Sequence, residues 1–437
     1  MTSEVNPNIL NFPAEMKILI ISHLFFPARG GVESHLTRLS RYLAQNGYQI
    51  EVLTTSALST EAFFLGDKRR ISPEEETIDG VHIKRLGFKT FGRRTLNFLR
   101  SVACRIKYPL NQWIRLISYG PRNNQFIDLS LEAKPDVIVA APLPMMTVYY
   151  GWKAAQIQGV PLIINPAYHI NDPCSFENPI FFRLMGDADI VAVHTETEKE
   201  FLAQKAGLSL DRIEVLPPLP FEKKDLIQAK TKISKQEARK KYGIKGQHVL
   251  LFVGQHGRHK NIDLILKAMP LVWKEMTEVE AVIAGGTTAY TEELKSLAYQ
   301  LAESCGSNFK AKIKFIDDFP QERKEEIFAL GDIFISLSKY ESFGIVFAEA
   351  MIHKLPVIAS QFSIARSIID DFQTGLLINP HCEIETAGAI IDLLEDDKLR
   401  KIYGEAGYEK VKQEFDPDKI INKWAKILNR LGLKNKN

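Results

Sequence analysis

The chain has 437 residues, of which 45% are hydrophobic and 25% are charged, and its formal net charge is +3. This length is too great for one ordinary core and suits two domains. The small net charge gives no general argument for a nucleic-acid partner, so a charged partner has to be sought in local clusters.

The four cysteines, Cys104, Cys174, Cys305 and Cys382, are widely separated and have no histidine at metal-ligand spacing. We therefore expect free thiols in a reducing compartment. The apolar run Ile18–Ile21 is too short for a signal segment or a membrane span. The sequence predicts a cytoplasmic protein.

The first half of the chain alternates predicted strands with predicted helices. A strand at Lys17–Ser22 leads into a loop with Gly30 and Gly31, and a helix with an apolar stripe follows it. Such alternation implies right-handed crossovers and a parallel sheet, in a domain over residues 16–220. Later strands are predicted at Gln49–Thr54, Val81–Arg85, Asp136–Ala141, Pro161–Asn165, Ile190–His194 and Ile213–Leu216.

Residues 221–246 are lysine-rich and weakly apolar, and we interpret them as an inter-domain connection. A second α/β series predicts a domain over residues 247–415, followed by a terminal helix over 416–437. Two doubly wound domains facing each other across a cleft would bind ligands at the carboxyl ends of their strands. The strands of the second series are predicted at Val249–Gly254, Glu280–Ala284, Lys312–Ile316, Asp332–Leu337, Val357–Ser360 and Gly375–Ile378.

The strongest functional signal lies between Asp332 and Ser360. Glu349 is a lone carboxylate on an otherwise apolar predicted helix, which is costly unless a partner such as a ribose diol hydrogen-bonds it. Glu341 lies on the loop just before that helix. Singly, Glu349 could complement the helix dipole and Glu341 could be a solvated acid, but the pair together favours a ligand site.

The start of this helix suits an anion or a sugar oxygen. The backbone N–H groups of Phe343, Gly344 and Ile345 open the helix, and Gly344 lets a ligand approach the backbone closely.

The segment E-S-F-G-I-V-F-A-E-A-M resembles the E-x7-E signature of retaining glycosyltransferases of family 4, which have the GT-B fold of two Rossmann-like domains. The resemblance implies that Glu341 contacts hydroxyls of a donor sugar and that Glu349 binds the ribose of its nucleotide. It implies that the amides between them touch the sugar and the diphosphate. It extends from about Met16 to the C-terminus and implies that the terminal helix returns to the N-terminal domain.

Two further motifs resemble donor-binding elements of this family. In F-P-A-R-G-G-V-E-S-H, the N–H groups of Gly30 and Gly31 can face a donor phosphate, although a turn that needs positive φ would also explain the glycines. In V-G-Q-H-G-R-H-K, Lys260 matches the family's lysine. Gln255 stands where the family has an arginine and supplies no charge, so Arg258 or His259 would have to substitute for it.

The acceptor side departs further from the family. The stretch P-L-I-I-N-P-A-Y-H has Ala167 where the family has a histidine, and His169 follows two residues later. We take His169 as the candidate catalytic histidine, against the alternative of an ordinary loop histidine. His194 and Thr195 mark another strand end that would face the cleft.

Residues 84–125 form a basic, aromatic insertion. This composition suits an anionic membrane surface, a lipid-diphosphate or phosphorylated acceptor, or a solvated helical face, and no nucleic-acid motif accompanies it. Its basic residues are Lys84, Arg85, Lys89, Arg93, Arg94, Arg100, Arg105, Lys107, Arg115 and Arg122.

The resemblance implies a retaining, metal-independent transferase that moves a hexose-type sugar from a UDP- or GDP-sugar to a glycan, lipid-linked or small-molecule acceptor in cell-envelope or polysaccharide glycosylation. Glu341, His169 and Lys260 would be catalytic. No metal or other cofactor is expected, because the Asp-Asp pairs of the sequence lack the loop context of a metal site. The enzyme would be cytoplasmic, and binding of the basic insertion to anionic lipid would place it at the inner face of the plasma membrane. The alternative is a non-catalytic, nucleotide-sugar-binding scaffold.

Overall fold

The computed structural model describes residues 16–64, 69–89, 95, 98–99, 101–102, 111–227, 233–362 and 364–434. The chain divides into two compact units, one of Met1–Leu219 with Pro417–Asn437 and one of Pro220–Asp416.

The N-terminal unit contains an eight-stranded sheet in the order β3-β4-β2-β1-β5-β6-β7-β8. All neighbouring strands are parallel except β3, which pairs antiparallel with β4 and was not predicted. The strands are β1 Lys17–Ser22, β2 Gln49–Thr55, β3 Glu75–Ile78, β4 Val81–Leu86, β5 Val137–Ala141, β6 Leu162–Ile164, β7 Ile190–Val193 and β8 Ile213–Val215.

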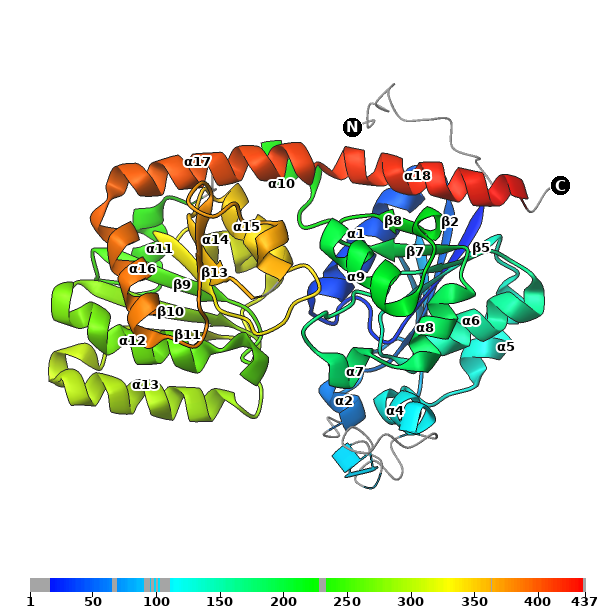
Figure 1. Ribbon diagram of the computed structural model, residues 1–437, viewed down its shortest axis with the longest axis horizontal. Coiled ribbons are helices and arrows are strands. Elements are labelled where there is room, and N and C mark those ends of the chain that lie inside the picture. The colour runs from blue at the N-terminus through cyan, green and yellow to red at the C-terminus, as the bar shows by residue number, and fades with distance from the viewer. Residues whose placement is uncertain are drawn as a thin grey trace. The chain divides into compact units, whose positions relative to one another are not determined.

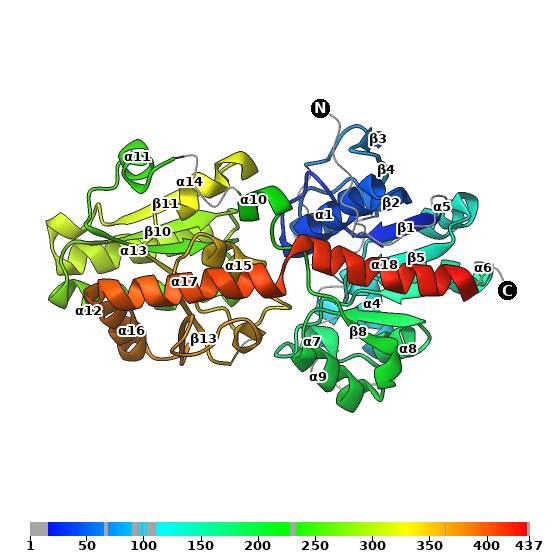
Figure 2. The ribbon, with the colours of Figure 1, turned by 90° about the horizontal axis from the view of Figure 1, so that it is seen from above.

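Helices cover both faces of this sheet (Figure 1). Leu19 and Ile21 of β1 join a core with helices α4, α5, α6 and α8, whereas Ile18 and Ile20 alternate with them and are equally buried. Helix α18 packs on this unit beside α1 (Figure 2), where Tyr48 donates to Asn429 at 3.2 Å and Arg430 pairs with Glu214 at 3.0 Å. The helices are α1 Gly31–Gln45, α2 Glu61–Phe64, α4 Asn111–Tyr119, α5 Gln125–Ala133, α6 Met146–Gln158, α7 Pro173–Phe176, α8 Pro179–Gly186, α9 Glu196–Ala206 and α18 Pro417–Lys434.

The C-terminal unit contains a six-stranded parallel sheet in the order β11-β10-β9-β12-β13-β14. Its strands are β9 His248–Val253, β10 Val279–Gly285, β11 Ile313–Asp317, β12 Ile333–Ser336, β13 Val357–Ser360 and β14 Gly375–Ile378. The strands predicted from alternation and apolar runs coincide with these to within one or two residues at each end.

Two helical layers flank the second sheet. Ile333 and Ile335 of β12 face a core with α12, α13 and α16. Phe334 points to the other face, where it lies 6.1 Å from the Phe328 ring of α14 and 6.2 Å from the Phe347 ring of α15. The helices are α10 Lys223–Ile227, α11 Lys235–Lys241, α12 Ile262–Glu275, α13 Thr291–Cys305, α14 Lys324–Phe328, α15 Ile345–Ile352, α16 Glu383–Glu395 and α17 Asp397–Glu414.

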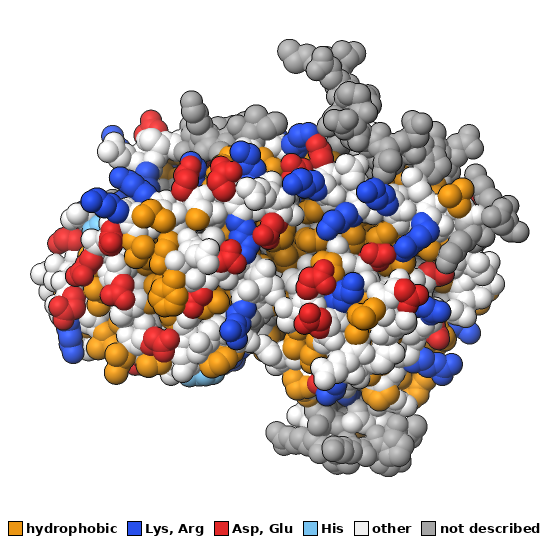
Figure 3. All heavy atoms as spheres, turned by 45° about the horizontal axis from the view of Figure 1, so that its top comes forward, with side chains coloured by type: hydrophobic (Ala, Val, Ile, Leu, Met, Phe, Trp, Pro, Cys, Tyr) orange, Lys and Arg blue, Asp and Glu red, His pale blue; other side chains and the backbone are white. Residues whose placement is uncertain are grey.

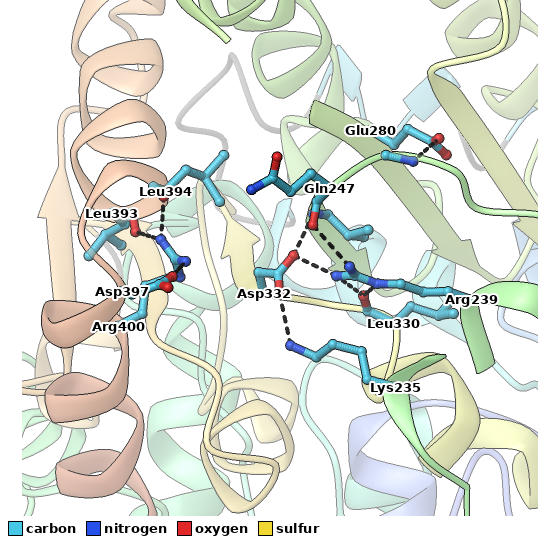
Figure 4. A network of polar contacts seen from close by, with 12 residues as sticks. Lys235, Arg239, Gln247, Glu280, Leu330, Asp332, Leu393, Leu394, Asp397 and Arg400 are labelled. Carbon is cyan, nitrogen blue, oxygen red and sulfur yellow. Dashed lines mark hydrogen bonds and ion pairs between the residues drawn. The ribbon is translucent and has the colours of Figure 1, made fainter. Parts of the chain in front are cut away.

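Helix α11, which lies within the predicted connection over residues 221–246, is bound to the C-terminal unit by ion pairs and hydrogen bonds (Figure 4). Asp332, just before β12, accepts from Lys235 at 2.8 Å, from Arg239 at 2.5 Å and from the Val249 N–H at 2.7 Å. Burial alone would raise the pKa of Asp332, but the two cations hold it below its usual value. Lys235 and Arg239 of this lysine-rich segment therefore anchor α11 to the start of β12.

The expectation of four free thiols was wrong at Cys174, which is disulfide-bonded. Cys305 and Cys382 are free, and Cys104 lies outside the described residues. The disulfide at Cys174 does not fit the expectation that all thiols are kept reduced. Among the described residues, no helix is both long and apolar enough to cross a membrane.

Candidate functional site

The candidate site of the C-terminal unit lies at the point where the strand order reverses. Strands β9 and β12 are neighbours, yet β9 continues toward β10 on one side and β12 toward β13 on the other. The loops that follow these two strands therefore diverge. In open α/β sheets, ligands usually bind in the crevice between such loops. The loop after β9 carries Gln255 to Lys260, and the loop after β12 carries Glu341.

Lys260 and Glu341 form an ion pair between these two loops, and their side chains are only 16% and 12% exposed. Lys260 ends a short 3-10 helix, Arg258–Lys260, that follows β9. The Lys339 N–H donates to the His259 carbonyl at 2.8 Å, and the His259 ring stacks on Tyr340 at 5.2 Å. The structure thus brings together two of the three predicted catalytic residues.

Gly344 connects the second loop to helix α15. Its φ of +83° is a left-handed conformation, and a Cβ there would come within 2.5 Å of the Phe347 ring. Both observations require glycine. Phe343 is buried edge-on against Phe415 at 5.2 Å, so its predicted role in binding can be played only by its backbone. Ile345 is the first residue of α15.

Glu349 lies on α15 with only 6% of its surface exposed, and it is paired with Lys324 of α14. A lone carboxylate on an apolar helix needs a hydrogen-bonding partner, and a lysine from a neighbouring helix is that partner here. Lys324 was not predicted, because nothing in the surrounding Q-E-R-K-E-E sequence distinguishes it from a solvated helix start.

Arg258 does not join the site. Its guanidinium pairs with Glu293 at 2.7 Å and lies 4.1 Å from the Tyr290 ring, so it points toward α13. Gln255 is exposed beside Gly286. The buried residue of this loop is His256, whose N–H donates to the Gly286 carbonyl at 2.8 Å and joins the loops after β9 and β10.

The Asp-Asp pairs have structural roles. Asp317 pairs with Lys295 at 2.7 Å, and Asp318 accepts from the hydroxyl of Thr287 at 2.6 Å. Asp370 pairs with Lys410, and Asp396 caps the start of α17. Within the part of the chain that the structure describes, no group of three histidine, cysteine or acidic side chains has a geometry that could hold a metal ion.

The N-terminal unit has its own switch point, between β1 and β5, and the glycine-rich loop follows β1. Gly30 has an extended φ of 169° and neither glycine is left-handed, so a turn that needs positive φ does not explain them. A Cβ on Gly30 would instead meet the Glu33 carboxylate at 2.0 Å. Burial raises the pKa of Glu33 to about 7, and the neighbouring His23 has its pKa lowered to about 3 by burial.

Polar side chains gather where β6 and β7 end in the same unit. His194 is buried and its Nε2 lies 3.1 Å from the Asn165 amide oxygen, while burial lowers its pKa to about 3. Glu198 accepts the His194 N–H at 2.7 Å and the Tyr168 N–H at 3.1 Å, and burial raises its pKa to about 8. This carboxyl group therefore holds the two strand ends together.

His169 lies on the loop after β6, half-buried and stacked on Phe176 at 4.8 Å. Its charge contributes to the lowered pKa of His194, so the two histidines are neighbours. Ala167, which stands where the family has a histidine, has a left-handed φ of 45° and is buried. Such strain in a non-glycine residue is typical of functional loops.

The described cations of the basic insertion are largely engaged within the protein. Arg85 is buried and paired with Glu76, and Lys84 lies 3.4 Å from Glu51. Arg115 is buried and donates to the carbonyls of Glu177 and Cys174. On the face drawn in Figure 3, described basic and acidic side chains are interspersed. Arg93, Arg94, Arg100, Arg105 and Lys107 lie outside the described residues.

Two family models match the chain and divide it as the sheets do. Residues 29–219 match the model described as Glycosyltransferase Family 4, and residues 234–410 match the model described as Glycosyl transferases group 1. The second match begins at the capping residue of α11 and includes both signature glutamates.

The curated relatives described here are identical to the chain at fewer than a third of the matched residues. The α-D-kanosaminyltransferase of Streptomyces kanamyceticus is 23% identical over 299 residues, which are 65% of this chain and 74% of that protein. A D-inositol 3-phosphate glycosyltransferase of Xylanimonas cellulosilytica is 23% identical over 85% of each chain. A protein of the same name from Corynebacterium aurimucosum is 29% identical, but the match spans only 54% of its length.

Solved structures agree on the fold. HepE of Anabaena, solved with UDP and glucose, has a TM-score of 0.70 at 18% identity, with 95% of this chain and 100% of that chain covered. Sucrose-phosphate synthase of Thermosynechococcus elongatus has a TM-score of 0.74 at 18% identity, with 95% and 99% covered. With two doubly wound units, a lysine and two glutamates at the second switch point and both family models matched, the chain belongs to glycosyltransferase family 4 and has the GT-B fold.

Proposed function

We propose that this glycosyltransferase binds a nucleotide-sugar donor, UDP- or GDP-linked, at the β9/β12 switch point of its C-terminal unit. The observation that carries the proposal is the convergence of Lys260, Glu341, Gly344 and Glu349 on two adjacent loops and the helix that follows them. HepE, which shares the fold, has been solved with UDP-glucose.

Each group has a distinct chemical role in this proposal. The Lys260 ammonium stabilises the charge that develops on the departing diphosphate, together with the N-terminus of α15. Glu341 binds hydroxyls of the transferred sugar, and Glu349 binds the ribose diol. Because Lys260 and Glu341 pair with each other here, donor binding has to redistribute this contact.

We further propose that the reaction needs no metal ion and retains the anomeric configuration of a hexose-type sugar. In this reaction the acceptor hydroxyl oxygen bonds to the anomeric carbon on the face from which the diphosphate leaves, the bond from that carbon to the diphosphate oxygen breaks, and the hydroxyl proton passes to the departing diphosphate. The acceptor is a glycan, a lipid-linked sugar or a small molecule. In the N-terminal unit, His169 on the loop after β6 is the candidate catalytic residue that would act on it. With such acceptors, the product would belong to the cell envelope or to a polysaccharide.

A donor screen tests this proposal. The purified chain is incubated with UDP- and GDP-linked sugars, with and without EDTA, while thermal stabilisation, nucleotide release and the anomeric configuration of the product are followed. We expect one donor to stabilise and to be turned over in EDTA, and Glu349→Ala to lose both effects. Binding and turnover that survive Glu349→Ala would contradict the assignment of the site, and a requirement for a divalent ion would contradict the metal-free reaction.

Peripheral membrane binding through the basic insertion stays a prediction. Sedimentation with liposomes that contain anionic lipid, at low salt, tests it. If the protein stays in the supernatant, the insertion has another role, such as binding of a phosphorylated acceptor.

A further inference from the structure

An ion pair joins two helices next to the donor site, and only one of its members belongs to the sequence signature. Lys324 begins α14 and Glu349 lies within α15, and the lysine Nζ is 2.5 Å from Oε1 of the glutamate. The side chains are 22% and 8% exposed. The pair is therefore shielded from solvent on most sides. Removal of either side chain would leave the other as an uncompensated charge in a largely buried position.

The packing of α14 fixes where Lys324 lies. Ile327 and Phe328 of the same helix are buried, and the Phe328 ring is stacked on His353 at 5.0 Å and contacts Phe334 of β12 at 6.1 Å. The ammonium group is thus placed by a helix that packs against both the sheet and the end of α15. Burial, and secondarily the Lys324 charge, lower the pKa of His353 to about 4. His353 is therefore neutral at pH 7 and does not add to the positive charge that Glu349 meets.

We propose that Lys324 is a donor-positioning residue, which holds the Glu349 carboxylate oriented to accept hydrogen bonds from the ribose diol of the nucleotide sugar. This inference rests on the proposed function. Lys324 acts through Glu349 and has no assigned contact with the sugar that is transferred. Its effect should therefore appear in the recognition of the ribose and not in the chemical step.

Substitutions of Lys324 distinguish the effect of its charge from the effect of its side-chain shape. Lys324→Met keeps most of the side-chain volume but leaves a buried carboxylate without its counter-charge, which is strongly unfavourable. Lys324→Arg keeps the charge. Lys324→Gln keeps a hydrogen-bond donor without the charge and serves as a second neutral variant if the Met variant does not fold. Lys241→Met is the matched control. It removes an exposed lysine of α11 that pairs with Glu326 of α14, the helix that also carries Lys324.

The experiment measures the dissociation constants of UDP and GDP and of their 2′-deoxy and 3′-deoxy forms by calorimetry. The wild type and Lys241→Met should prefer the ribonucleotide by about tenfold or more, because loss of a hydroxyl leaves Glu349 without a hydrogen bond. Lys324→Met or Lys324→Gln should reduce this preference to less than about threefold, and Lys324→Arg should restore it. In turnover assays the neutral variants should raise KM more than they lower kcat.

Glu349→Gln distinguishes the inference from the function on which it rests. If Glu349→Gln abolishes the ribose preference but the neutral Lys324 variants keep it, Lys324 is only a structural residue and the inference is overturned. If a neutral Lys324 variant weakens both nucleotide forms equally, the inference is likewise overturned. If Glu349→Gln keeps the preference, the ribose role in the proposed function fails, and the inference fails with it.

Discussion

Lys260 and Arg258 are close neighbours in the sequence, yet the structure gives their charges different surroundings. Lys260 is largely buried against Glu341, whereas Arg258 and Glu293 are 68% and 58% exposed. An exposed pair contributes at most about 1 kcal/mol, and a mostly buried cation at a diphosphate site contributes far more. We expect Lys260→Met to lower donor kcat/KM by about 100-fold or more and Arg258→Met to change it less than about threefold.

Steady-state kinetics with the donor identified by the screen checks this pair of variants. If both substitutions lower kcat/KM equally, Arg258 replaces the family's missing arginine after movement of its side chain. If neither does, the diphosphate is not bound at this loop.

His353 provides a prediction of pH dependence. Its pKa is 6.5 when unperturbed and about 4 in the folded chain, where burial disfavours the charged form. The stability that this neutral ring confers is therefore present above pH 6.5 and is lost as the pH falls toward 4, by about 1.4 kcal/mol per pH unit. Between pH 7.5 and pH 5, His353→Gln should lose less unfolding free energy than the wild type.

Urea unfolding of the two proteins at both pH values measures this difference. The carboxyl groups of Glu33 and Glu198 have raised pKa values and act in the opposite direction, but they do so equally in both proteins. Parallel stability profiles for wild type and variant would contradict the assignment to His353.

At the residue scale, a local pattern can predict which residues lie close together, whereas the roles of these residues in binding stay predictions. Glu341, Gly344 and Glu349 fall on one loop and helix, so their spacing alone implied a shared site. Lys324 could not be found this way, because its contact with Glu349 depends on how α14 and α15 pack on the sheet. Arg258 was selected by charge alone, and the direction of its side chain is set by Tyr290 and Glu293.

At the scale of elements, the start of α15 depends on a single backbone conformation. Gly344→Ala should cost about 1–2 kcal/mol for the left-handed φ, in addition to a clash with Phe347, and should weaken donor binding. Gly388 is the control, because it lies within α16 and its added Cβ would meet nothing within 4 Å. Gly388→Ala should stabilise the chain by up to about 1 kcal/mol and leave donor binding unchanged.

Thermal melts and donor titrations of these two glycine variants test the geometry of the helix start. Equal stability of Gly344→Ala and the wild type would show that the turn can adopt another conformation. Retained donor affinity in a destabilised Gly344→Ala would show that the ligand does not use the helix terminus.

Helix α11 supplies a second test at this scale. Because Asp332 holds Lys235 and Arg239, the amides of α11 should be protected from hydrogen exchange in the wild type. Asp332→Asn should speed their exchange by about tenfold or more, since it removes the negative charge that two cations share. Glu405→Gln, which alters an exposed pair with Lys354, should not. Fast exchange throughout α11 in the wild type would support the original interpretation as a connection.

Strands were predicted better than helices and connections for a physical reason. A buried parallel strand is a short, continuous apolar run, and such runs mark β9, β10 and β12 in the sequence. A short polar helix such as α11 depends on ion pairs with distant residues, and these leave no periodic pattern. Composition alone therefore made it look like a linker.

At the scale of the whole molecule, the two units repeat one architecture with different contents. Each sheet reverses its strand order at one switch point, and the loops there carry most of the candidate residues. The C-terminal switch point carries charged side chains paired with each other. In the N-terminal unit, carboxyl and imidazole groups are buried with pKa values shifted toward their neutral forms. The paired charges of the C-terminal switch point fit the charged nucleotide-sugar donor proposed for that unit.

The fold could be predicted because it rests on the alternation of strands and helices, and the proposed donor site rests on a motif with defined spacing. The acceptor side could not be predicted in this way, because Ala167 stands where the family has a histidine. Part of the basic insertion also lies outside the described residues.

The central claim is that the donor binds at the β9/β12 switch point, and hydrogen exchange of the full chain with and without saturating nucleotide sugar tests it most directly. We predict slower exchange in residues 254–260 and 338–352 on donor binding. If binding is saturated and both segments exchange unchanged, while protection appears only in the N-terminal unit, the donor site has been assigned to the wrong unit.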